Sequence, residues 1–241
     1  MVTKSELKYI QSLSDKKVRL ETGCFIAEGV KLVGEMIAAG YPLKAVYALD
    51  SWESPDATLE VTRIEAFELE KMSMLQTPNQ VLAVAMMPQQ IKALDLTGQL
   101  TLVLDGIQDP GNMGTIIRTA DWFGIQVIIC SFDTVDCYNQ KVLQATMGSW
   151  NRVQIEYHSL KDILPQLNKP IYGALLNGTP LQKTTLNHEG ILVVGNEGQG
   201  ISNAVEAIVT NPISINGFGG AESLNVAVAT GILLHELTKV S

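Results

Sequence analysis

The sequence predicts an α/β fold in which a parallel sheet, covered by helices on both faces, follows a smaller α/β domain. From Thr101 onward, short apolar runs alternate with helical segments, and the runs lack the polar alternation of half-exposed strands. A polar stretch with turn residues at 89–98 separates this pattern from an earlier set of strands and helices. We therefore expect one domain at 1–95 and a second at 96–241.

The first domain is expected to begin with a helix and a turn. Apolar residues then recur at three- and four-residue steps between Val30 and Ala38, which is the spacing of one helix face. Gly40 ends this helix, and residues 44–49 (KAVYAL) predict a short strand. A further strand is predicted at 80–88 (QVLAVAMMP).

Five apolar runs predict the strands of the second domain, at residues 101–105, 126–130, 171–176, 191–195 and 212–215. Helices are predicted at residues 115–123, 139–149, 160–167 and 224–238. This order of elements is typical of a parallel sheet whose strands are joined by helical crossovers.

The composition narrows the class of protein. The 241 residues are 46% hydrophobic and 17% charged, which is ordinary for a chain that buries a core. No apolar stretch reaches the roughly 18 residues of a membrane span, and residues 1–17 lack the apolar segment of a secretory signal. We expect a cytoplasmic protein that does not bind membranes. Three cysteines without a CxxC pair and three scattered histidines predict neither a disulfide framework nor a metal site.

The charge is unevenly distributed. A net charge of −8 opposes binding to nucleic acid, because phosphates are bound where cations gather. The densest cationic group is Lys16, Lys17 and Arg19. One hypothesis is a solvated helix face, and the other is a cationic arm on an acidic body.

Three segments share one arrangement, in which a buried strand leads through a loop rich in Gly, Asn or Pro into a helix. They are residues 102–124, 191–202 and 212–236. In open α/β sheets, ligands bind outside the carboxyl ends of the strands, and glycines there let backbone groups approach a ligand. A single loop of this kind is explained equally well as a capped turn. Three in one domain favour a ligand site.

The glycines of the second loop exclude two common cofactor motifs. Residues 195–200 read GNEGQG, which is neither a GxGxxG fingerprint nor a Walker A loop. A dinucleotide-dependent dehydrogenase therefore loses support. A side chain at Gly195 or Gly198 is expected to crowd a ligand, so Gly195→Val should weaken ligand binding in a folded protein.

Polar side chains gather in the same three loops: Asn112, Arg118, Asn196, Glu197, Glu222, Ser223 and Asn225. Each has a structural explanation, since Asn112 and Ser223 could cap helices, Arg118 could extend to water, and Glu197 could be a solvated carboxylate. Their joint occurrence at three strand ends favours one converging site.

These residues resemble the motifs of the SpoU/TrmH family of RNA 2′-O-methyltransferases, within the SPOUT superfamily. The first motif is similar to residues 112–124 (NMGTIIRTADWFG), the second to 192–202 (LVVGNEGQGIS) and the third to 221–236 (AESLNVAVATGILLHE). The resemblance spans about residues 100–238. Residues 1–90 resemble the substrate-binding domain that often precedes this catalytic domain, through SDKKVRLETG and FIAEG (Phe25–Gly29).

Two positions depart from the family pattern. Asn216 follows Ile215, where the family often has Pro, and Gln144 precedes Ala145, where the family often has Arg. The second departure removes one expected RNA contact. The motif side chains themselves are present.

The resemblance implies a C-terminal trefoil knot, a homodimer and transfer of a methyl group from S-adenosylmethionine to a ribose 2′-hydroxyl of tRNA or rRNA. It implies catalytic roles for Asn112, Arg118, Glu197, Ser223 and Asn225, and cofactor binding at Gly195, Asn196, Gly198, Ile215 and Leu224, without a metal. We expect Lys16, Lys17 and Arg19 to bind the RNA. Two alternatives are a catalytically inactive knotted RNA-binding protein and a SPOUT enzyme that methylates an RNA base.

The family assigns activation of the hydroxyl to Arg118. An arginine keeps its proton in proteins, so either Arg118 loses it transiently in a dry site, or it orders the hydroxyl or a phosphate by charge-assisted hydrogen bonds. Asn112 and Ser223 would position Arg118 and the RNA phosphate. Glu197 would orient the arginine or its loop, and Asn225 would hold the third loop.

Overall fold

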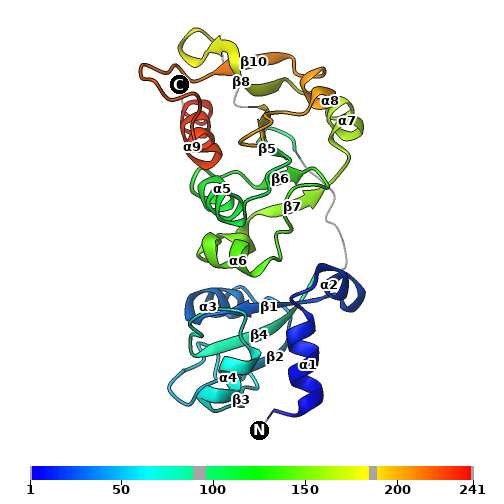
Figure 1. Ribbon diagram of the computed structural model, residues 1–241, viewed down its shortest axis with the longest axis vertical. Helices are drawn as coiled ribbons and strands as arrows, with labels where there is room; N and C mark the ends of the chain where they lie inside the picture. The colour runs from blue at the N-terminus through cyan, green and yellow to red at the C-terminus, as the bar shows by residue number, and fades with distance from the viewer. Residues whose placement is uncertain (1, 89–95, 185–188, 240–241) are drawn as a thin grey trace. The chain divides into compact units, whose positions relative to one another are not determined.

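The computed structural model describes residues 2–88, 96–184 and 189–239 (Figure 1). The chain divides into two compact units. The first combines the N-terminal part of the chain with Asp136–Asn151, and the second contains the remainder. Residues 89–95 of the predicted linker lie outside the described residues. Each unit is described by itself.

The first unit is built on a four-stranded sheet in the order β1-β4-β2-β3. The strands are β1 (Cys24–Glu28), β2 (Leu43–Ala48), β3 (Thr62–Arg63) and β4 (Val81–Met86). β4 pairs antiparallel with β1 and β2, while β2 and β3 are parallel. Its helices are α1 (Lys4–Ser12), α2 (Lys16–Thr22), α3 (Val30–Ala38), α4 (Ala66–Met72) and α6 (Gln140–Thr146), and a 3-10 turn η1 (Ser149–Arg152) follows α6.

β1 is a strand that the hydrophobic spacing did not distinguish from the helix after it. All five of its residues are buried, so it has no polar alternation. Gly29, at φ +97°, then turns the chain into α3. A residue with a Cβ would be strained in that conformation, and the strand therefore ends where the FIAEG segment has its glycine.

The second unit contains a six-stranded sheet in the order β10-β8-β9-β5-β6-β7, and every neighbouring pair is parallel. The strands are β5 (Leu100–Asp105), β6 (Val127–Cys130), β7 (Gln154–Tyr157), β8 (Ile171–Pro180), β9 (Gly190–Gly195) and β10 (Asn211–Ser214). The predicted parallel α/β sheet is confirmed. β7 was not predicted, because its sequence QIEY is short and half polar.

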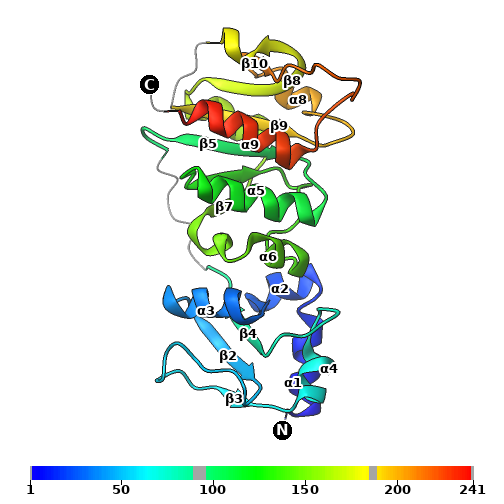
Figure 2. The same ribbon diagram turned by 90° about the vertical axis from the view of Figure 1, so that its left-hand side faces the viewer.

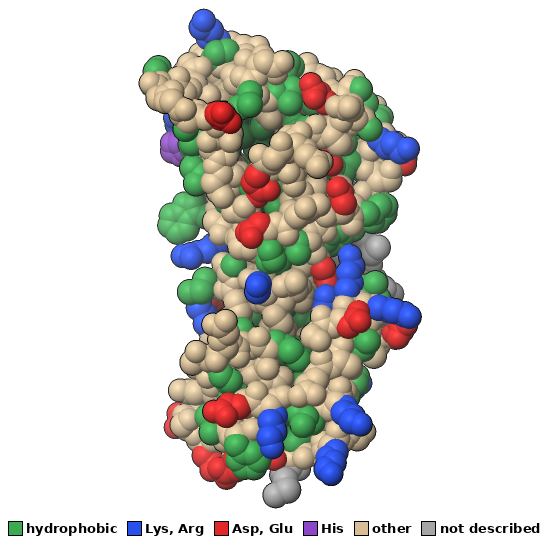
Figure 3. Space-filling model, in the orientation of Figure 1, with side chains coloured by type: hydrophobic (Ala, Val, Ile, Leu, Met, Phe, Trp, Pro, Cys, Tyr) green, Lys and Arg blue, Asp and Glu red, His purple; other side chains and the backbone are tan. Residues whose placement is uncertain are grey.

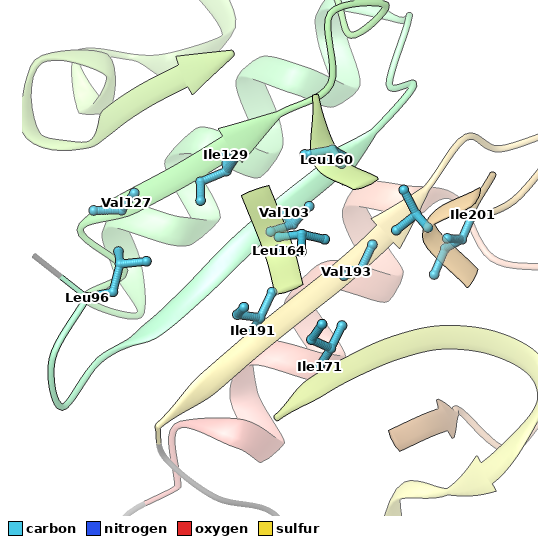
Figure 4. Close-up of a cluster of buried hydrophobic side chains, with 11 residues drawn as sticks. Leu96, Val103, Val127, Ile129, Leu160, Leu164, Ile171, Ile191, Val193 and Ile201 are labelled. Atoms are coloured by element: carbon cyan, nitrogen blue, oxygen red, sulfur yellow. The ribbon is translucent and has the colours of Figure 1, made fainter. Parts of the chain in front are cut away.

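Helices cover both faces of this sheet. On one face α5 (Pro110–Trp122) and α9 (Val226–Leu237) pack side by side (Figure 2). On the other face lie α7 (Leu160–Ile163), a 3-10 turn η2 (Leu164–Leu167) and α8 (Asn203–Glu206), and a further 3-10 turn, η3 (Leu181–Lys183), follows β8. Leucines of α7 and η2 pack onto apolar side chains of four strands, including Val103 and Ile191 (Figure 4).

The helix boundaries differ from the predicted ones where local chemistry decides them. α5 begins at Pro110, earlier than predicted, because Asp109 caps it and proline suits a first turn. α6 ends at Thr146, earlier than predicted, because Met147 and Gly148 adopt positive φ. None of the described helices is long and apolar enough to span a bilayer.

The parallel sheet brings several loops to one edge. β5, β6, β9 and β10 all end at this carboxyl edge, because parallel strands point the same way. In Figure 2 it lies on the right, where β5 leads through its loop into α5. The three glycine-rich loops of the sequence therefore follow strands that end on one side of the sheet.

Candidate functional site

A chain of hydrogen bonds joins the three loops. Asn112, on α5, donates from Nδ2 to Oε1 of Glu197 in the loop after β9. Asn225, at the start of α9, donates from Nδ2 to Oδ1 of Asn112 at 2.9 Å. One amide side chain thus contacts both other loops, using its donor and its acceptor. The structure brings together three of the five residues to which the resemblance gives catalytic roles.

Local capping explains why the Asn112 side chain is available for these contacts. Asp109 caps α5, and its Oδ1 accepts the Asn112 backbone N–H at 2.7 Å. Asn112 therefore does not cap the helix. Asn225 caps α9, with Oδ1 accepting the N–H groups of Ala227 at 3.0 Å and Val228 at 3.4 Å. The side-chain amide of Asn225 remains free to reach Asn112.

Asn196 fixes the shape of the loop after β9. Its Oδ1 accepts the backbone N–H groups of Gly198 at 2.9 Å and Gln199 at 3.1 Å, and its Nδ2 donates to the carbonyl of Gly106 at 2.8 Å. Its backbone exchanges two hydrogen bonds with Gly200. Both polar ends of this side chain are used within the protein, so Asn196 can meet a ligand through its loop but not with a spare amide.

Position 195 requires glycine for a structural reason that the sequence did not reveal. A Cβ at this position would lie 2.2 Å from the carbonyl carbon of Gly200 and 2.3 Å from its oxygen. The position of such a Cβ is occupied by the backbone of Gly200, where the loop folds back toward β9. The expectation that Gly195→Val would leave the protein folded and affect only a ligand is therefore wrong, because the substitution would first break the turn between Asn196 and Gly200.

The loop after β10 leaves its backbone groups unpaired. Residues 217–223 make no hydrogen bond to any other described residue. At the two ends of this stretch, Ile215 is half-buried and Leu224 is exposed. A run of free N–H and C=O groups beside a glycine-rich loop at the same sheet edge suits a ligand held mainly by the main chain.

Arg118 and Ser223 are not part of the hydrogen-bonded group. Arg118 lies exposed on α5 and forms no ion pair or hydrogen bond within the described parts of the chain. It precedes Trp122 by four residues, so both side chains share one face of α5. Ser223 is also exposed and has no hydrogen-bond partner among the residues described. Both side chains are available to an incoming substrate.

The expected cationic group in the first unit contains one residue that cannot contact a partner. Arg19 is only 5% exposed, and its guanidinium donates to the carbonyls of Leu13 and Ser14 and pairs with Asp136. Including Arg19 among RNA-facing cations was therefore wrong, because its charge is buried and bound within the protein. Lys16 and Lys17 are exposed, and Lys17 lies 3.9 Å from Glu21.

The sequence pattern missed a buried carboxylate at the end of β5. Asp105 is nearly inaccessible, and its Oδ2 accepts the backbone N–H of Ser202 at 2.8 Å. It borders a small cavity of about 50 Å³ together with Gln108 and Asp133. The signal was a carboxylate as the last residue of an otherwise apolar strand. No group of three or more His, Cys, Asp or Glu in the described parts of the chain is placed to hold a metal ion.

Comparison with known proteins identifies the family to which the chain belongs. Residues 99–235 match the SpoU rRNA methylase family, and residues 4–83 match the MRM3-like substrate binding domain. The chain belongs to the SpoU rRNA methylase family. The resemblance inferred from the three motifs is confirmed, and the residues that join the loops lie within the SpoU match.

Relatives with established names match over almost the whole length. The 23S rRNA (guanosine(2553)-2′-O)-methyltransferase RlmP of Bacillus subtilis is 34% identical over 241 residues, which is 96% of this chain and 95% of that protein. The structure of a TrmH-family protein from Porphyromonas gingivalis is 38% identical with a TM-score of 0.89, covering 98% of both chains. An AdoMet-bound rRNA methyltransferase from Sinorhizobium meliloti is 27% identical with a TM-score of 0.84, covering 98% of this chain and 95% of that one.

Proposed function

We propose that this SpoU protein transfers a methyl group from S-adenosylmethionine to a ribose 2′-hydroxyl of RNA. The observation that carries the proposal is the contact of Asn112 with Glu197 and Asn225, which links the three family motifs at one edge of the sheet. Two relatives support it, since the Bacillus protein is named a 2′-O-methyltransferase and the Sinorhizobium protein was solved with AdoMet.

The backbone of two loops would hold the cofactor. Unpaired main-chain groups at 217–223 fit a ligand with many hydrogen-bonding atoms, and Ile215 and Leu224 flank them. Gly195, Asn196 and Gly198 form the neighbouring turn. When bound, the cofactor supplies a methyl group that already carries a good leaving group. The task of the protein is then to align the nucleophile and manage its proton.

Arg118 is the side chain we assign to the ribose. Its side chain is exposed on α5 and has no partner among the described residues, so it can donate to the 2′-hydroxyl or to an adjacent phosphate. Because an arginine stays protonated, we assign it orientation of these oxygens by charge-assisted hydrogen bonds. Ser223 would donate to the RNA phosphate, and the group formed by Asn112, Glu197 and Asn225 would hold the surrounding loops in place.

We assign substrate binding to residues 1–95 and methyl transfer to residues 96–241. The match of residues 4–83 to a substrate binding domain supports the first assignment, and exposed Lys16 and Lys17 are its candidate phosphate contacts. The substrate is ribosomal or transfer RNA, and the name of the Bacillus relative favours ribosomal RNA. The enzyme would act in the cytoplasm.

We also propose a trefoil knot in residues 96–241 and a homodimer. The knot rests on membership of the family. The dimer has support from α5 and α9, which expose Trp122 (85%), Val228 (53%) and Ile232 (37%). Large apolar side chains exposed on adjacent helices are typical of a protein interface. In sedimentation experiments, the wild type should be a dimer and Trp122→Asp should be a smaller species. A monomeric wild type would contradict the proposed homodimer.

The activity is tested by mass spectrometry of nuclease-digested RNA from a strain that lacks the protein. One 2′-O-methylated nucleotide should disappear and should return with the wild-type gene but not with Arg118→Ala. Loss of a base-methylated nucleotide would instead identify a base methyltransferase. An unchanged RNA, together with purified protein that does not bind S-adenosylmethionine, would indicate an inactive RNA-binding protein.

A further inference from the structure

Two phenylalanine side chains lie exposed in loops at the carboxyl edge of the six-stranded sheet. Phe132 follows β6 and is 67% exposed, and Phe218 lies in the loop after β10 and is 97% exposed. Exposed aromatic rings forgo the stabilisation that burial would give them. Neither ring contributes to the core, so its position at this edge needs another explanation.

A fixed turn holds Phe132 outward. Its neighbours Ser131 and Thr134 are buried, and Ser131 Oγ accepts the backbone N–H of Gly106 at 2.8 Å. Thr134 Oγ1 donates to the carbonyl of Leu104 at 3.1 Å. The turn is thus attached to the end of β5 on both sides of Phe132. The exposure of the ring follows from a well-anchored backbone rather than from a loose loop.

Phe218 stands alone on a loop of small residues. It lies between Gly217 and the pair Gly219 and Gly220, where added Cβ atoms would meet nothing within 4 Å. The strand before the loop is held by Ser214 Oγ, which donates to the carbonyl of Gly178 at 2.9 Å, and Asn225 holds the other end through Asn112. Within residues 217–221, which lie between these two anchored ends, the ring is the one large side chain and is open to a flat partner.

The charge of this edge argues against a phosphate as that partner. The loops at 105–109, 131–135, 195–202 and 215–225 contain five carboxylates and no Lys or Arg. Figure 3 shows acidic side chains gathered on this face of the second unit. The carboxylates are Asp105, Asp109, Asp133, Glu197 and Glu222. They repel an RNA backbone, so nucleotides at this edge must be held largely by uncharged contacts.

We propose that Phe132 and Phe218 stack on unpaired RNA bases beside the ribose that receives the methyl group. This rests on the function proposed above and adds how that site selects its substrate. Every base has an aromatic face, and proteins recognise single-stranded RNA by stacking splayed-out bases on aromatic side chains. Stacking is neutral and is compatible with an acidic edge. The two rings thereby favour a loop or bulge over a duplex, whose bases are already stacked.

The test measures methyl transfer by Phe132→Ala, Phe218→Ala and the double variant on an RNA that the wild type methylates. Removing a base-stacking aromatic typically weakens binding about five- to 150-fold. We expect KM for RNA to rise about tenfold for each single variant. For Phe132→Ala, which lies outside the proposed cofactor loops, kcat and the affinity for S-adenosylmethionine should be unchanged. Trp at either position should restore KM. Leu176→Ala, which removes another exposed apolar side chain (83%) of the same unit, is the matched control and should change nothing.

Salt dependence distinguishes stacking from an ionic contact. The slope of log affinity against log salt should be the same for Phe218→Ala and wild type, since no phosphate contact is lost. Wild-type activity with unchanged KM in both variants would overturn the stacking role and leave the proposed function intact. Loss of the dimer or of cofactor affinity in Phe132→Ala would also overturn the stacking role, because Phe132 would then belong to the dimer interface or to the cofactor site. A wild type that methylates no RNA would overturn both proposals.

Discussion

Asn112 illustrates how one side chain can connect three loops. Its amide donates to Glu197 while its carbonyl accepts from Asn225, a combination that a carboxylate could not provide. The role depends on Asp109, which caps the helix in its place. The sequence showed Asn112 as either a cap or a site residue, and the choice between the two depends on the backbone, which places Asp109 at the cap.

Arg118→Ala should reduce kcat for RNA methylation by roughly 10²-fold, because misplacing a reacting group by about 1 Å can cost about 10²-fold. The affinity for S-adenosylmethionine should be nearly unchanged, because Arg118 forms no hydrogen bond or ion pair with the described parts of the cofactor loops. Turnover assays and calorimetry measure the two quantities. Arg152→Ala, which removes a surface pair with Asp121, is the control and should keep activity. Near-normal turnover of Arg118→Ala would remove it from its role.

Glu28 of the FIAEG segment is buried, and its burial raises the pKa of the carboxyl above its ordinary value. Hydrogen bonds from Ser73 and the Met74 backbone act in the opposite direction but are smaller. The folded protein therefore binds this proton more tightly than the unfolded chain does. Stability should fall as pH rises from the unfolded pKa of about 4.5 through the folded value.

Glu28→Gln removes this titration. Relative to wild type, the variant should become progressively more stable as pH rises through that window, and the difference should be constant above it. Urea unfolding of both proteins at several pH values measures it. If the unfolding free energies of wild type and Glu28→Gln change with pH in parallel, the pKa of Glu28 is the same in the folded and unfolded states. Glu21→Gln, at an exposed position of α2, is the control.

At the scale of elements, the sequence predicted the strands and helices of the second unit well, because buried strands and amphipathic helices differ strongly in pattern. It did not predict the attachment of α6. Arg19 pairs with Asp136, 117 residues away, and Gln144 Nε2 donates to the carbonyl of Glu28 at 2.7 Å. No local spacing encodes such long-range pairs. For the same reason, the sequence did not show that Arg19 is buried, and we expected it to be an exposed cation.

Gln140 and Gln144 attach α6 to β1, the edge strand of the first sheet. Gln140 Nε2 donates to the carbonyl of Ile26 at 2.6 Å, alongside the Gln144 contact. Gln140→Ala or Gln144→Ala leaves a β1 carbonyl without its donor. When that carbonyl is buried, the loss lowers the free energy of unfolding by about 1–3 kcal/mol. Hydrogen exchange at residues 24–28 should accelerate in both variants. Lys141→Ala, on the exposed side of α6, should not change it. Unchanged protection in both glutamine variants would show that β1 is held without α6.

The protein as a whole is acidic, although its substrate, RNA, is an anion. The net charge is −8, and the loops of the sheet edge add no cation. Ion pairs with RNA phosphates therefore have to come from outside these loops, and Lys16 and Lys17 are exposed in the unit that matches a substrate binding domain. The sequence identified these lysines but could not tell that their neighbour is buried.

Lys16→Ala/Lys17→Ala should weaken RNA binding and lower the slope of log affinity against log salt by about 1.4, from about 0.7 for each of two phosphate contacts on a single strand. Cofactor affinity should not change. Lys161→Ala/Lys239→Ala removes the same charge from the second unit and is the control. Equal slopes for the two double variants would mean that net charge alone, and not a localised contact, governs binding.

Alkaline hydrolysis of labelled RNA distinguishes methylation of the ribose from methylation of a base. Purified protein is incubated with RNA and S-adenosylmethionine labelled on the methyl group, and the RNA is then hydrolysed in alkali. A 2′-O-methyl group blocks attack by its own oxygen, so the label should appear in alkali-resistant dinucleotides. Arg118→Ala should give only about a hundredth of this label in the same time. Label recovered in mononucleotides would lie on a base, and this result, or no label in RNA at all, would show that the protein is not a ribose methyltransferase.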